Sequence, residues 1–405
     1  MLNKDGLTDM LGKIKKIFKH MIELIDRKIL YLFYRFYPLH NTFLLESVPD
    51  ISDNTKAVYD EMVRRGINEK YKIIWLVKNT DCRYPETKNV SYYPLIARNH
   101  KERKKLIKVK LTCKYLISCN FFLTTERRGQ ISFYLGHGSA IKSIRSYYNM
   151  PKNIDHCLAA SSDMVNIMSY EMKTDKSKFF ALGYPRNDVL CKPGMDLHNV
   201  LNKSYKKVIV WYPTFRQHSS GGSSLTKNAL PIIHDLEKAI SLNDYAKEKG
   251  ILIVIKPHFA QDLSYIKNTE LSNIVFIDES LFIDNKISSY EFVAGCDALV
   301  TDYSSIYYDY TLCDKPMALV WEDYKEYESS VGFAVDMDEY MKGAEIIYTL
   351  DDFKVFIEHL SFDIDIKKAE RNEIKNLVNY SDDGKSSVRV VDFIFDKIHP
   401  KTEEV

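Results

Sequence analysis

Four short polar clusters hold the residues of this chain best suited to chemistry, and each directly follows an apolar run. The clusters are His137-Gly138-Ser139, Pro213-Thr214-Phe215-Arg216, Lys256-Pro257-His258 and Thr301-Asp302-Tyr303-Ser304-Ser305. Their hydroxyl, guanidinium, ammonium and imidazole groups bind phosphate oxygens and move protons. Each cluster is a weak signal alone, but together they predict a site for a diphosphate, with two histidines in different roles.

His137 is the candidate general base. The glycine that follows it, Gly138, carries no side chain, so we expect a substrate to approach the imidazole closely. An imidazole in this position can take a proton from an attacking hydroxyl. Lys142 could meet a phosphate or a carboxylate. The alternatives are a histidine whose hydrogen bonds are satisfied within a turn and a solvated lysine.

Ser304 and Ser305 follow the apolar run 298–300, as if a strand delivered two hydroxyls to the start of a helix. Backbone N–H groups and the positive end of a helix dipole converge at such a point and suit a phosphate. The alternative is an ordinary helix cap, because Ser and Asp are favoured caps in any αβ protein.

The second and third clusters repeat a cationic residue beside a rigid proline. Arg216 and Thr214 follow one predicted strand, and Lys256 and His258 follow another. A guanidinium offers fixed forked donors to phosphate, and an imidazole can donate to a phosphoryl oxygen. These four residues are therefore predicted donor ligands.

No metal or cofactor is predicted. His137 and His258 lie far apart in the sequence without a ligand pattern nearby, and Asp302 is the one carboxylate obviously placed to touch a cation. We expect a metal-free transfer in which Arg216, Lys256 and helix N-termini neutralise charge.

The elements that must position these clusters form an α/β fold. Apolar, β-branched runs alternate with helix-like stretches through residues 41–320, which is typical of parallel sheets flanked by helices. The predicted strands are 71–77, 115–118, 131–135, 208–212, 251–255, 274–277 and 298–301. Ligands of open parallel sheets bind at the carboxyl ends of the strands, so the four clusters could converge on one site.

Two domains are predicted, 41–195 and 196–405, because a Pro-Gly turn at 193–194 precedes a polar stretch. The Ser- and Gly-rich piece 219–224 is predicted to be a passive loop or a lid that orders over ligand. The chain has no Walker A sequence and no Gly-x-Gly-x-x-Gly, which argues against nucleoside triphosphate hydrolysis and a standard dinucleotide site.

Residues 1–40 are predicted to contain a long basic amphipathic helix. Its apolar positions follow helical spacing and are Leu7, Leu11, Ile14, Phe18, Met21, Ile25, Leu32 and Phe36. A second basic run occupies 98–110. Both features are typical of binding to an anionic membrane interface. The alternative for the N-terminal helix is packing on the domain or pairing in a dimer. The alternative for the run 98–110 is a solvated helix face.

Composition sets broader limits on the protein. The chain has 405 residues with a net charge of +2, so no global field recruits nucleic acid, and no nucleic-acid module is recognisable. The seven scattered cysteines without a Cys-x-x-Cys pair fit a reducing cytoplasm. We expect neither a signal peptide nor a spanning helix, and therefore any work at a membrane is done peripherally, from its cytoplasmic face.

The ordered motifs resemble the CDP-glycerol glycerophosphotransferase family of teichoic-acid and capsule enzymes. The motifs that carry the resemblance are Asp53-Asn54, Lys72-Ile73-Ile74-Trp75, His137-Gly138-Ser139, Gly183-Tyr184-Pro185-Arg186-Asn187-Asp188, Pro213-Thr214-Phe215-Arg216, Lys256-Pro257-His258 and Asp302-Tyr303-Ser304-Ser305. The similarity covers roughly 300 residues and weakens at Glu322-Asp323-Tyr324 and Gly332-Phe333. The ordered combination is specific although no single motif is.

The resemblance implies a GT-B architecture, in which two Rossmann-like domains face a cleft, with residues 41–195 as the acceptor domain and 196–405 as the CDP-donor-binding domain. It also implies a peripheral membrane enzyme. Such an enzyme moves a polyol phosphate, glycerol phosphate first among the candidates, from a CDP-activated donor to a hydroxyl of a lipid-linked or growing polymer acceptor, and releases CMP. By the same resemblance, His137 and His258 are catalytic, and His258 also belongs to the donor-binding set. The implied donor-binding residues are Thr214, Arg216, Lys256, His258, Asp302, Ser304 and Ser305. Residues implied to meet the acceptor or a phosphate are Gly138, Ser139, Lys142, Arg186 and Asn187.

One motif departs from the family. Where the family commonly has Trp-His-Gly-Thr-Pro-x-x-Lys, this chain has Gly136-His137-Gly138-Ser139-Ala140-Ile141-Lys142, which reshapes the wall beside the base on the side expected to meet the acceptor. Two other functions stay open on the residues alone. One is a GT-B glycosyltransferase that attacks a sugar carbon and releases a nucleoside diphosphate, and the other is a non-catalytic nucleotide-binding protein at the membrane surface.

Overall fold

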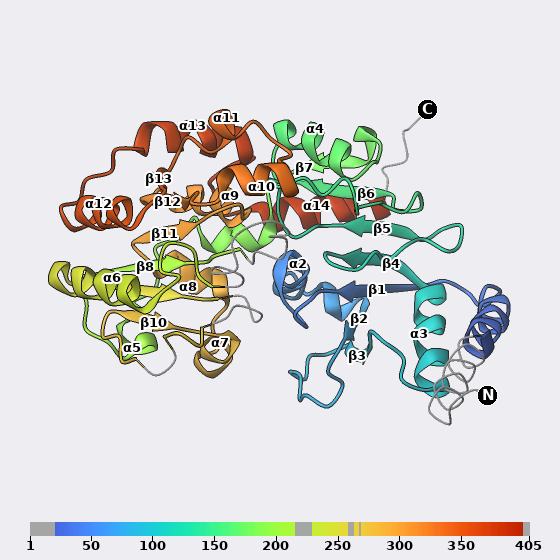
Figure 1. Ribbon diagram of the computed structural model, residues 1–405. Helices are drawn as coiled ribbons and strands as arrows, with labels where there is room; N and C mark the ends of the chain where they lie inside the picture. Colours follow the sequence, from blue (N-terminus) through green and yellow to red (C-terminus); the bar gives the residue numbers. More distant parts are fainter. Residues whose placement is uncertain (1–20, 215–228, 258–262, 267–268, 400–405) are drawn as a thin grey trace, which may run out of the picture. The chain divides into compact units, whose positions relative to one another are not determined.

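The computed structural model describes residues 21–214, 229–257, 263–266 and 269–399, which form an α/β protein with two parallel sheets (Figure 1). The predicted fold class is confirmed. Two compact units divide the chain. The N-terminal unit contains Met1–His137, Pro151–Cys157 and Val391–Val405, and the C-terminal unit contains Gly138–Met150 and Leu158–Val390.

This division differs from the expected boundary near residue 195. The chain passes from one unit to the other between His137 and Gly138, inside a predicted catalytic motif. Residues 141–143 belong to the C-terminal unit because their backbone bonds with residues 332–334: Ser143 N–H donates to Gly332 O at 3.0 Å and Ala334 N–H to Ile141 O at 2.7 Å. Such long-range pairing has no signature in local sequence.

The first sheet has seven strands in the order β3-β2-β1-β4-β5-β6-β7. The strands are β1 (His40–Glu46), β2 (Lys72–Val77), β3 (Val90–Pro94), β4 (Cys113–Ser118), β5 (Ile131–Tyr134), β6 (His156–Ala159) and β7 (Phe179–Ala181). Large apolar side chains fill its core. Phe43, Trp75 and Tyr115 are almost fully buried, and the rings of Phe43 and Tyr115 lie 4.8 Å apart.

The second sheet lies wholly in the C-terminal unit and has the order β10-β9-β8-β11-β12-β13. The strands are β8 (Lys207–Trp211), β9 (Ile251–Ile255), β10 (Ile274–Phe276), β11 (Ala298–Thr301), β12 (Met317–Val320) and β13 (Glu345–Ile347). Helices α6 (Leu236–Lys249) and α12 (Leu350–Ser361) cover one face, where Leu242, Phe353 and Ile357 join Ile253 and Val300 in one apolar core (Figure 1). Strands β9, β8 and β11 are parallel neighbours in this sheet, so their carboxyl ends lie at the same edge.

All seven predicted strands are present, with ends shifted by at most two residues. Strands β1, β3, β6, β7, β12 and β13 were not predicted, because short runs such as Met317-Ala318-Leu319-Val320 do not differ from a buried helix segment by pattern. The other helices and turns near the site are α2 (Asp53–Arg64), α3 (His100–Thr112), α4 (Ser162–Glu171), η3 (Pro185–Val189), α8 (Ser289–Gly295), α9 (Ile306–Tyr310), η4 (Thr311–Cys313), α13 (Lys368–Val378) and α14 (Ser386–Ile398). The remaining elements are η1 (Ile67–Glu69), η2 (Lys176–Lys178), α5 (His198–Leu201), α7 (Glu279–Asn285), α10 (Tyr324–Ser330) and α11 (Met337–Tyr340).

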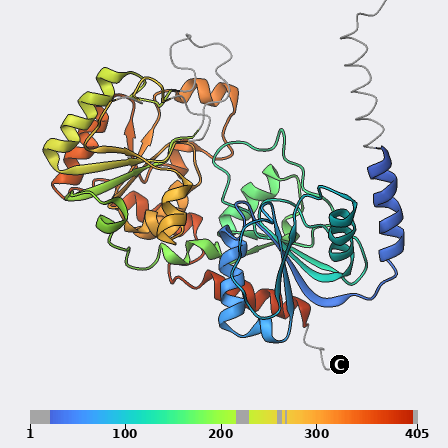
Figure 2. The same cartoon turned by 90° about the horizontal axis from the view of Figure 1, so that it is seen from below.

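Residues 21–34 form a helix that lies against α3 (Figure 2). Leu30 and Tyr34 are buried against Ile107 and Leu111. The first half of the predicted N-terminal helix, up to residue 20, lies outside the described residues. No helix among the described residues is both long and apolar enough to cross a bilayer.

The predicted apolar positions of this helix are not the ones that face α3. Met21, Ile25, Leu32 and Phe36 are all exposed, and the exposed fraction of Phe36 reaches 80%. On the polar side, Asp26 Oδ2 accepts from Arg103 Nη1 at 2.7 Å. The helix therefore packs on its unit by one side and leaves Met21, Ile25, Leu32 and Phe36, the predicted apolar positions that the structure describes, exposed.

Candidate active site

Asp302, at the end of β11, ties the ends of two strands together. Its side chain is fully buried, Oδ2 accepts from Thr214 N–H at 2.8 Å, and Oδ1 accepts from Tyr303 N–H at 2.7 Å and from the Thr214 hydroxyl. A carboxylate with these partners has its charge satisfied inside the protein. Among the described residues, no group of three His, Cys, Asp or Glu side chains could hold a metal ion.

Ser304 and Ser305 lie half-buried just before α9. Ser305 takes the N-cap position with helical backbone angles, but its side chain makes no capping hydrogen bond. The ordinary-cap alternative for Ser305 therefore fails. Because α9 has five residues, its dipole is small. Any anion bound there would therefore be held mainly by the serine hydroxyls and nearby cationic side chains.

Gly138 packs directly against Ser305. A Cβ atom added to Gly138 would lie 2.4 Å from Ser305 Oγ and 3.3 Å from Arg186 Nη2, and its φ of +134° is one that L side chains rarely adopt. The glycine is thus required by the approach of a serine from a distant segment. The sequence-based reason, open access to the imidazole, is not the contact that the structure records.

Arg186, on η3, is held by a buried carboxylate. Its Nη2 donates to Asp309 Oδ2 at 2.9 Å, and its guanidinium carbon lies 4.8 Å from the centre of the Tyr290 ring. Asp309, which is almost fully buried on α9, also accepts from Tyr290 Oη at 2.6 Å and from Asn187 Nδ2 at 2.7 Å. The buried side-chain amide of Asn187 therefore donates a hydrogen bond to Asp309.

Sequence reasoning missed Asp309 and Tyr290. A usable signal was present, because Asp309 is the single charged residue in the stretch Ile306-Tyr307-Tyr308-Asp309-Tyr310. A carboxylate on an otherwise apolar helix needs a cationic or hydrogen-bonding partner. The identity of that partner, more than 100 residues away, could not be read from the sequence.

Asp188 and Gly183, in the same motif as Arg186, bind the start of α14. Asp188 accepts from the backbone N–H groups of Ser386 at 2.7 Å and Ser387 at 2.9 Å. A Cβ atom on Gly183 would lie 2.4 Å from Ser386 Oγ. The segment from Gly183 to Asp188 is therefore fixed at both ends by contacts with the start of α14, which restricts the position of Arg186 between them.

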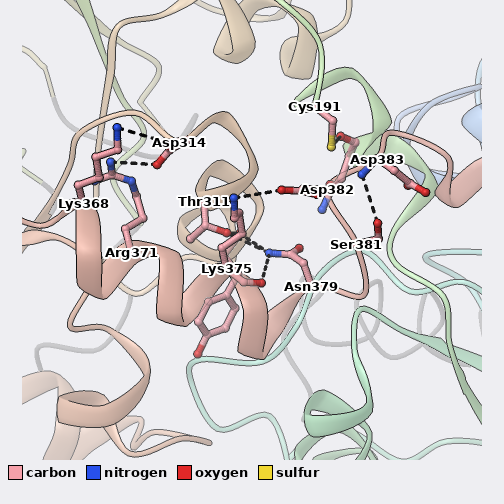
Figure 3. Close-up of polar contacts among 12 residues, drawn as sticks. Cys191, Thr311, Asp314, Lys368, Arg371, Lys375, Asn379, Ser381, Asp382 and Asp383 are labelled. Atoms are coloured by element: carbon pink, nitrogen blue, oxygen red, sulfur yellow. Dashed lines mark hydrogen bonds and ion pairs between the residues drawn. The ribbon is translucent and has the colours of Figure 1, made fainter.

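Helix α13 packs against α9 and η4, and Figure 3 shows its polar contacts with Thr311 and Asp314. Asn379, just past the end of α13, donates from Nδ2 to Thr311 Oγ1 at 3.0 Å. Arg371 is completely buried and donates to Asp365 Oδ1 at 2.9 Å and to Asp314 Oδ1 at 3.3 Å. These contacts fix α9 and η4 at their C-terminal side.

The remaining predicted ligands of the C-terminal unit are placed as follows. Ser139 is buried and its hydroxyl lies 3.4 Å from Tyr184 Oη, and Lys142 is half-buried in an antiparallel bridge with Phe333. Lys256 Nζ, at the end of β9, lies 2.7 Å from Glu279 Oε1. Two further predicted ligands, Arg216 and His258, lie outside the described residues.

His137 is the last residue of its motif that belongs to the N-terminal unit. It lies two residues past Leu135, and its side chain is exposed. Its Nδ1 lies 3.1 Å from Cys119 O, and a carbonyl can only accept, so Nδ1 carries the proton. In the neutral form of the ring, Nε2 bears the lone pair. Asn54 Nδ2 donates to Gly136 O at 2.9 Å and holds the backbone beside the imidazole.

The structure therefore joins three predicted residues from separate segments, Gly138, Arg186 and Ser305, in the C-terminal unit. It also joins Thr214 to Asp302. In the N-terminal unit the Cys119 carbonyl accepts from His137 Nδ1, which leaves Nε2 as the ring nitrogen able to accept a proton. These contacts can bind an anion through cations and hydroxyls and can accept a proton at an imidazole nitrogen.

Comparison with known proteins agrees with this chemistry. A family model described as CDP-Glycerol:Poly(glycerophosphate) glycerophosphotransferase matches residues 29–396. The chain is 22% identical to the teichoic acid glycerol-phosphate primase of Bacillus subtilis (strain 168), over 81% of this chain and 88% of the primase. It is 25% identical to a teichoic acid poly(glycerol phosphate) polymerase of Staphylococcus epidermidis, over 73% of this chain but 40% of the polymerase. A solved structure of the wall teichoic acid polymerase TagF has a similar fold, with a TM-score of 0.72 at 19% identity, covering 97% of this chain and 99% of that one.

Proposed function

This chain belongs to the CDP-glycerol:poly(glycerophosphate) glycerophosphotransferase family, and we propose that it transfers glycerol phosphate from CDP-glycerol to a hydroxyl of a lipid-linked or growing cell-surface polymer, releasing CMP. The family match over residues 29–396 confirms the predicted family and the predicted class of enzyme, a polyol-phosphate transferase. The donor, the acceptor and the residue roles are the proposal.

The convergence of Gly138, Ser305 and Arg186 is the observation that carries the proposal. Three segments bring a guanidinium, a hydroxyl and a side-chain-free backbone together, and Asp309 and Tyr290 fix the guanidinium. A fixed cation beside a hydroxyl suits the charge that develops on phosphoryl oxygens during transfer. One such donor can contribute about 3 kcal/mol to the transition state.

In the proposed reaction, His137 Nε2 takes the proton of the acceptor hydroxyl as its oxygen attacks the phosphorus nearest the glycerol. A phosphodiester bond forms between acceptor and glycerol phosphate, and the bond to the bridging oxygen of CDP-glycerol breaks. CMP leaves with that oxygen. The Nδ1–H···O contact to Cys119 orients the base for this step.

The other predicted residues are divided between contact and support. Arg216, Lys256, His258, Ser304 and Ser305 are proposed donor ligands, and Ser139 and Lys142 line the acceptor side. Thr214, Asp302 and Asn187 are proposed to position these ligands, because their polar atoms are bound within the protein.

Peripheral attachment to an anionic membrane is part of the proposal. Between residues 21 and 36 the exposed apolar side chains are Met21, Ile22, Leu24, Ile25, Ile29, Leu32, Phe33 and Phe36. The helix of residues 21–34, which carries all of these side chains except Phe36, lies against α3, whose exposed lysines are Lys101, Lys104, Lys105 and Lys108. Uncovered apolar side chains beside exposed lysines support binding at a membrane interface.

The test is CMP release from CDP-glycerol and from CDP-ribitol in the presence of a membrane extract. We expect CMP from CDP-glycerol with the wild type and a loss of about 10²- to 10⁴-fold in His137→Ala, with the affinity for CDP unchanged. Equal loss of CDP affinity would contradict the role of His137 as base. CMP from CDP-ribitol alone would correct the polyol, and silence with both donors despite CDP binding would overturn the proposed reaction.

A further inference from the structure

Glu46 is a buried carboxylic acid at the carboxyl end of β1, in the N-terminal unit. Its side chain is completely buried, and Oε2 accepts from Asn120 N–H at 3.1 Å and from Phe121 N–H at 2.9 Å. Its other oxygen, Oε1, is buried and has no hydrogen-bond partner among the described residues. None of the roles assigned above uses this group.

The turn that Glu46 binds also holds His137. Asn120 and Phe121 directly follow Cys119, whose carbonyl oxygen is the partner of His137 Nδ1 at 3.1 Å. Asn120 Oδ1 in turn accepts from Val48 N–H at 2.7 Å, two residues past Glu46. Hydrogen bonds thus join the exits of β1 and β4 at Asn120 and Phe121, next to the Cys119 carbonyl that contacts the imidazole.

We infer that Glu46 is a positioning residue for catalysis: it fixes the turn at residues 119–121 so that the Cys119 carbonyl holds His137 in the Nδ1–H tautomer with Nε2 ready to accept a proton. This inference rests on the proposed role of His137 as the base. Glu46 itself lies behind the turn and acts on the reaction through the peptide, without touching the substrate.

The energetics of the group agree with a dedicated role. Burial raises the pKa of Glu46 to about 7, although the backbone N–H groups of Asn120 and Phe121 oppose that rise. A buried carboxyl costs stability that an apolar residue would not cost. Its removal would leave two backbone N–H groups without an acceptor and allow the Cys119 carbonyl to move. A displacement of about 1 Å near reacting groups can cost about 100-fold in rate.

The experiment compares Glu46→Ala, Glu46→Gln, His137→Ala and the double variant Glu46→Ala/His137→Ala, with CDP-glycerol and a membrane extract. Glu46→Ala should lower kcat about 10- to 100-fold while KM for the donor changes less than about twofold. Glu46→Gln should stay within about threefold of the wild type, because its amide oxygen can accept both N–H bonds. In the His137→Ala background, Glu46→Ala should lower the residual rate no further.

The outcomes separate this inference from the proposed function. If His137→Ala keeps full activity, the proposed base fails and this inference fails with it. If His137→Ala is inactive but Glu46→Ala equals the wild type, only the inference is overturned. Additive losses in the double variant, or a Glu46→Gln as impaired as Glu46→Ala, also overturn it.

A second measurement does not depend on the donor or on the behaviour of Glu46→Ala. Histidine ¹⁵N NMR, with His137 assigned from the His137→Ala spectrum, should show the Nδ1–H tautomer in the wild type and in Glu46→Gln. Glu46→Asp, whose carboxylate ends one methylene short of the two N–H groups, should show a mixture of tautomers. An unchanged tautomer in Glu46→Asp, or the Nε2–H form in the wild type, would overturn the inference.

Discussion

At the scale of single residues, the site is defined by close approaches between segments far apart in the chain. Gly138 lies against Ser305, and Gly183 lies against Ser386. In each case a Cβ atom added to the glycine would lie 2.4 Å from the serine Oγ. Asp309 gathers three donors, from Arg186, Asn187 and Tyr290. Each of these positions tolerates one residue type for a steric or electrostatic reason, so single substitutions should have sharp effects.

Gly138→Ala should disrupt the phosphate ligands. The new methyl group overlaps Ser305 Oγ, and φ at +134° strains any L residue, so we expect a loss of about 1–3 kcal/mol in stability and at least about 10-fold in kcat/KM. Gly136→Ala is the matched control, because φ is +63° but the nearest atom, Tyr134 Cε1, lies 3.8 Å away. It should cost roughly 1 kcal/mol of strain. Chemical denaturation and CMP release measure both; equal effects of the two variants would contradict the steric account.

Glu46 should make stability depend on pH. Its pKa rises from 4.5 to about 7 on folding, so the folded state binds more protons than the unfolded state between these values. The stabilising contribution is full below about pH 4.5 and is lost as pH rises through about 7, a change of about 3 kcal/mol at most. Relative to Glu46→Gln, the wild type should therefore lose stability between about pH 5 and about pH 8 in urea denaturation. A difference independent of pH would show that Glu46 titrates normally.

At the scale of elements, the segment from Ser304 to Cys313 is fixed at its C-terminal end by contacts with α13 and Asn379. Helix α9 is too short to be stable alone, and α13 with Asn379 fixes its C-terminal continuation η4 (Figure 3). Arg371 is the centre of this support, since it is fully buried and paired with Asp365 and Asp314. The position of the hydroxyls at the start of α9 therefore depends on the contacts that α13 makes with α9 and η4.

Arg371→Met should destabilise the protein by about 3 kcal/mol, because two carboxylates lose their partner while the shape of the side chain is nearly kept. Lys368→Met is the control on the same helix. Lys368 also faces Asp314, at 4.0 Å, but is 62% exposed, so its replacement should change stability by no more than about 0.5 kcal/mol. Urea denaturation compares the two, and similar losses would show that burial does not decide the value of these ion pairs.

At the scale of the whole molecule, charge and apolar surface are unevenly distributed. The net charge is only +2, yet α3 exposes several lysines beside the helix formed by residues 21–34. That helix uses Leu30 and Tyr34 to pack on its unit, and Met21, Ile25, Leu32 and Phe33 on it remain exposed. This arrangement agrees with the proposed attachment to a membrane by one part of the N-terminal unit.

Phe36→Glu should weaken binding to vesicles of phosphatidylcholine and phosphatidylglycerol about 10-fold or more, because burial of one aromatic side chain contributes about 1.5–3 kcal/mol. Binding by the wild type should also fall with added salt. Phe362→Glu is the control, since Phe362 is 63% exposed but lies in the C-terminal unit. Vesicle sedimentation would contradict the proposal if Phe362→Glu weakened binding as much as Phe36→Glu, or if the wild type did not bind.

The sequence by itself determined the α/β class, the strands that precede the polar clusters and the family. These depend on local signals: apolar runs of strand length, proline and glycine at their exits, and a specific order of short motifs. The family match confirms the inference from motif order. Local patterns were sufficient because each strand and each motif is encoded within a few consecutive residues, and the order of the motifs can be read directly along the chain.

Only the tertiary structure showed which partner each polar residue contacts. Asp302 was predicted as a donor ligand but is bound to Thr214, Gly138 was explained by the imidazole but contacts Ser305, and Glu46 and Asp309 were not noticed. The division of the units after His137 was equally hidden. A side chain's role is set by its partner, and here the partners lie about 70 to 170 residues away in the chain, a separation that no local pattern encodes.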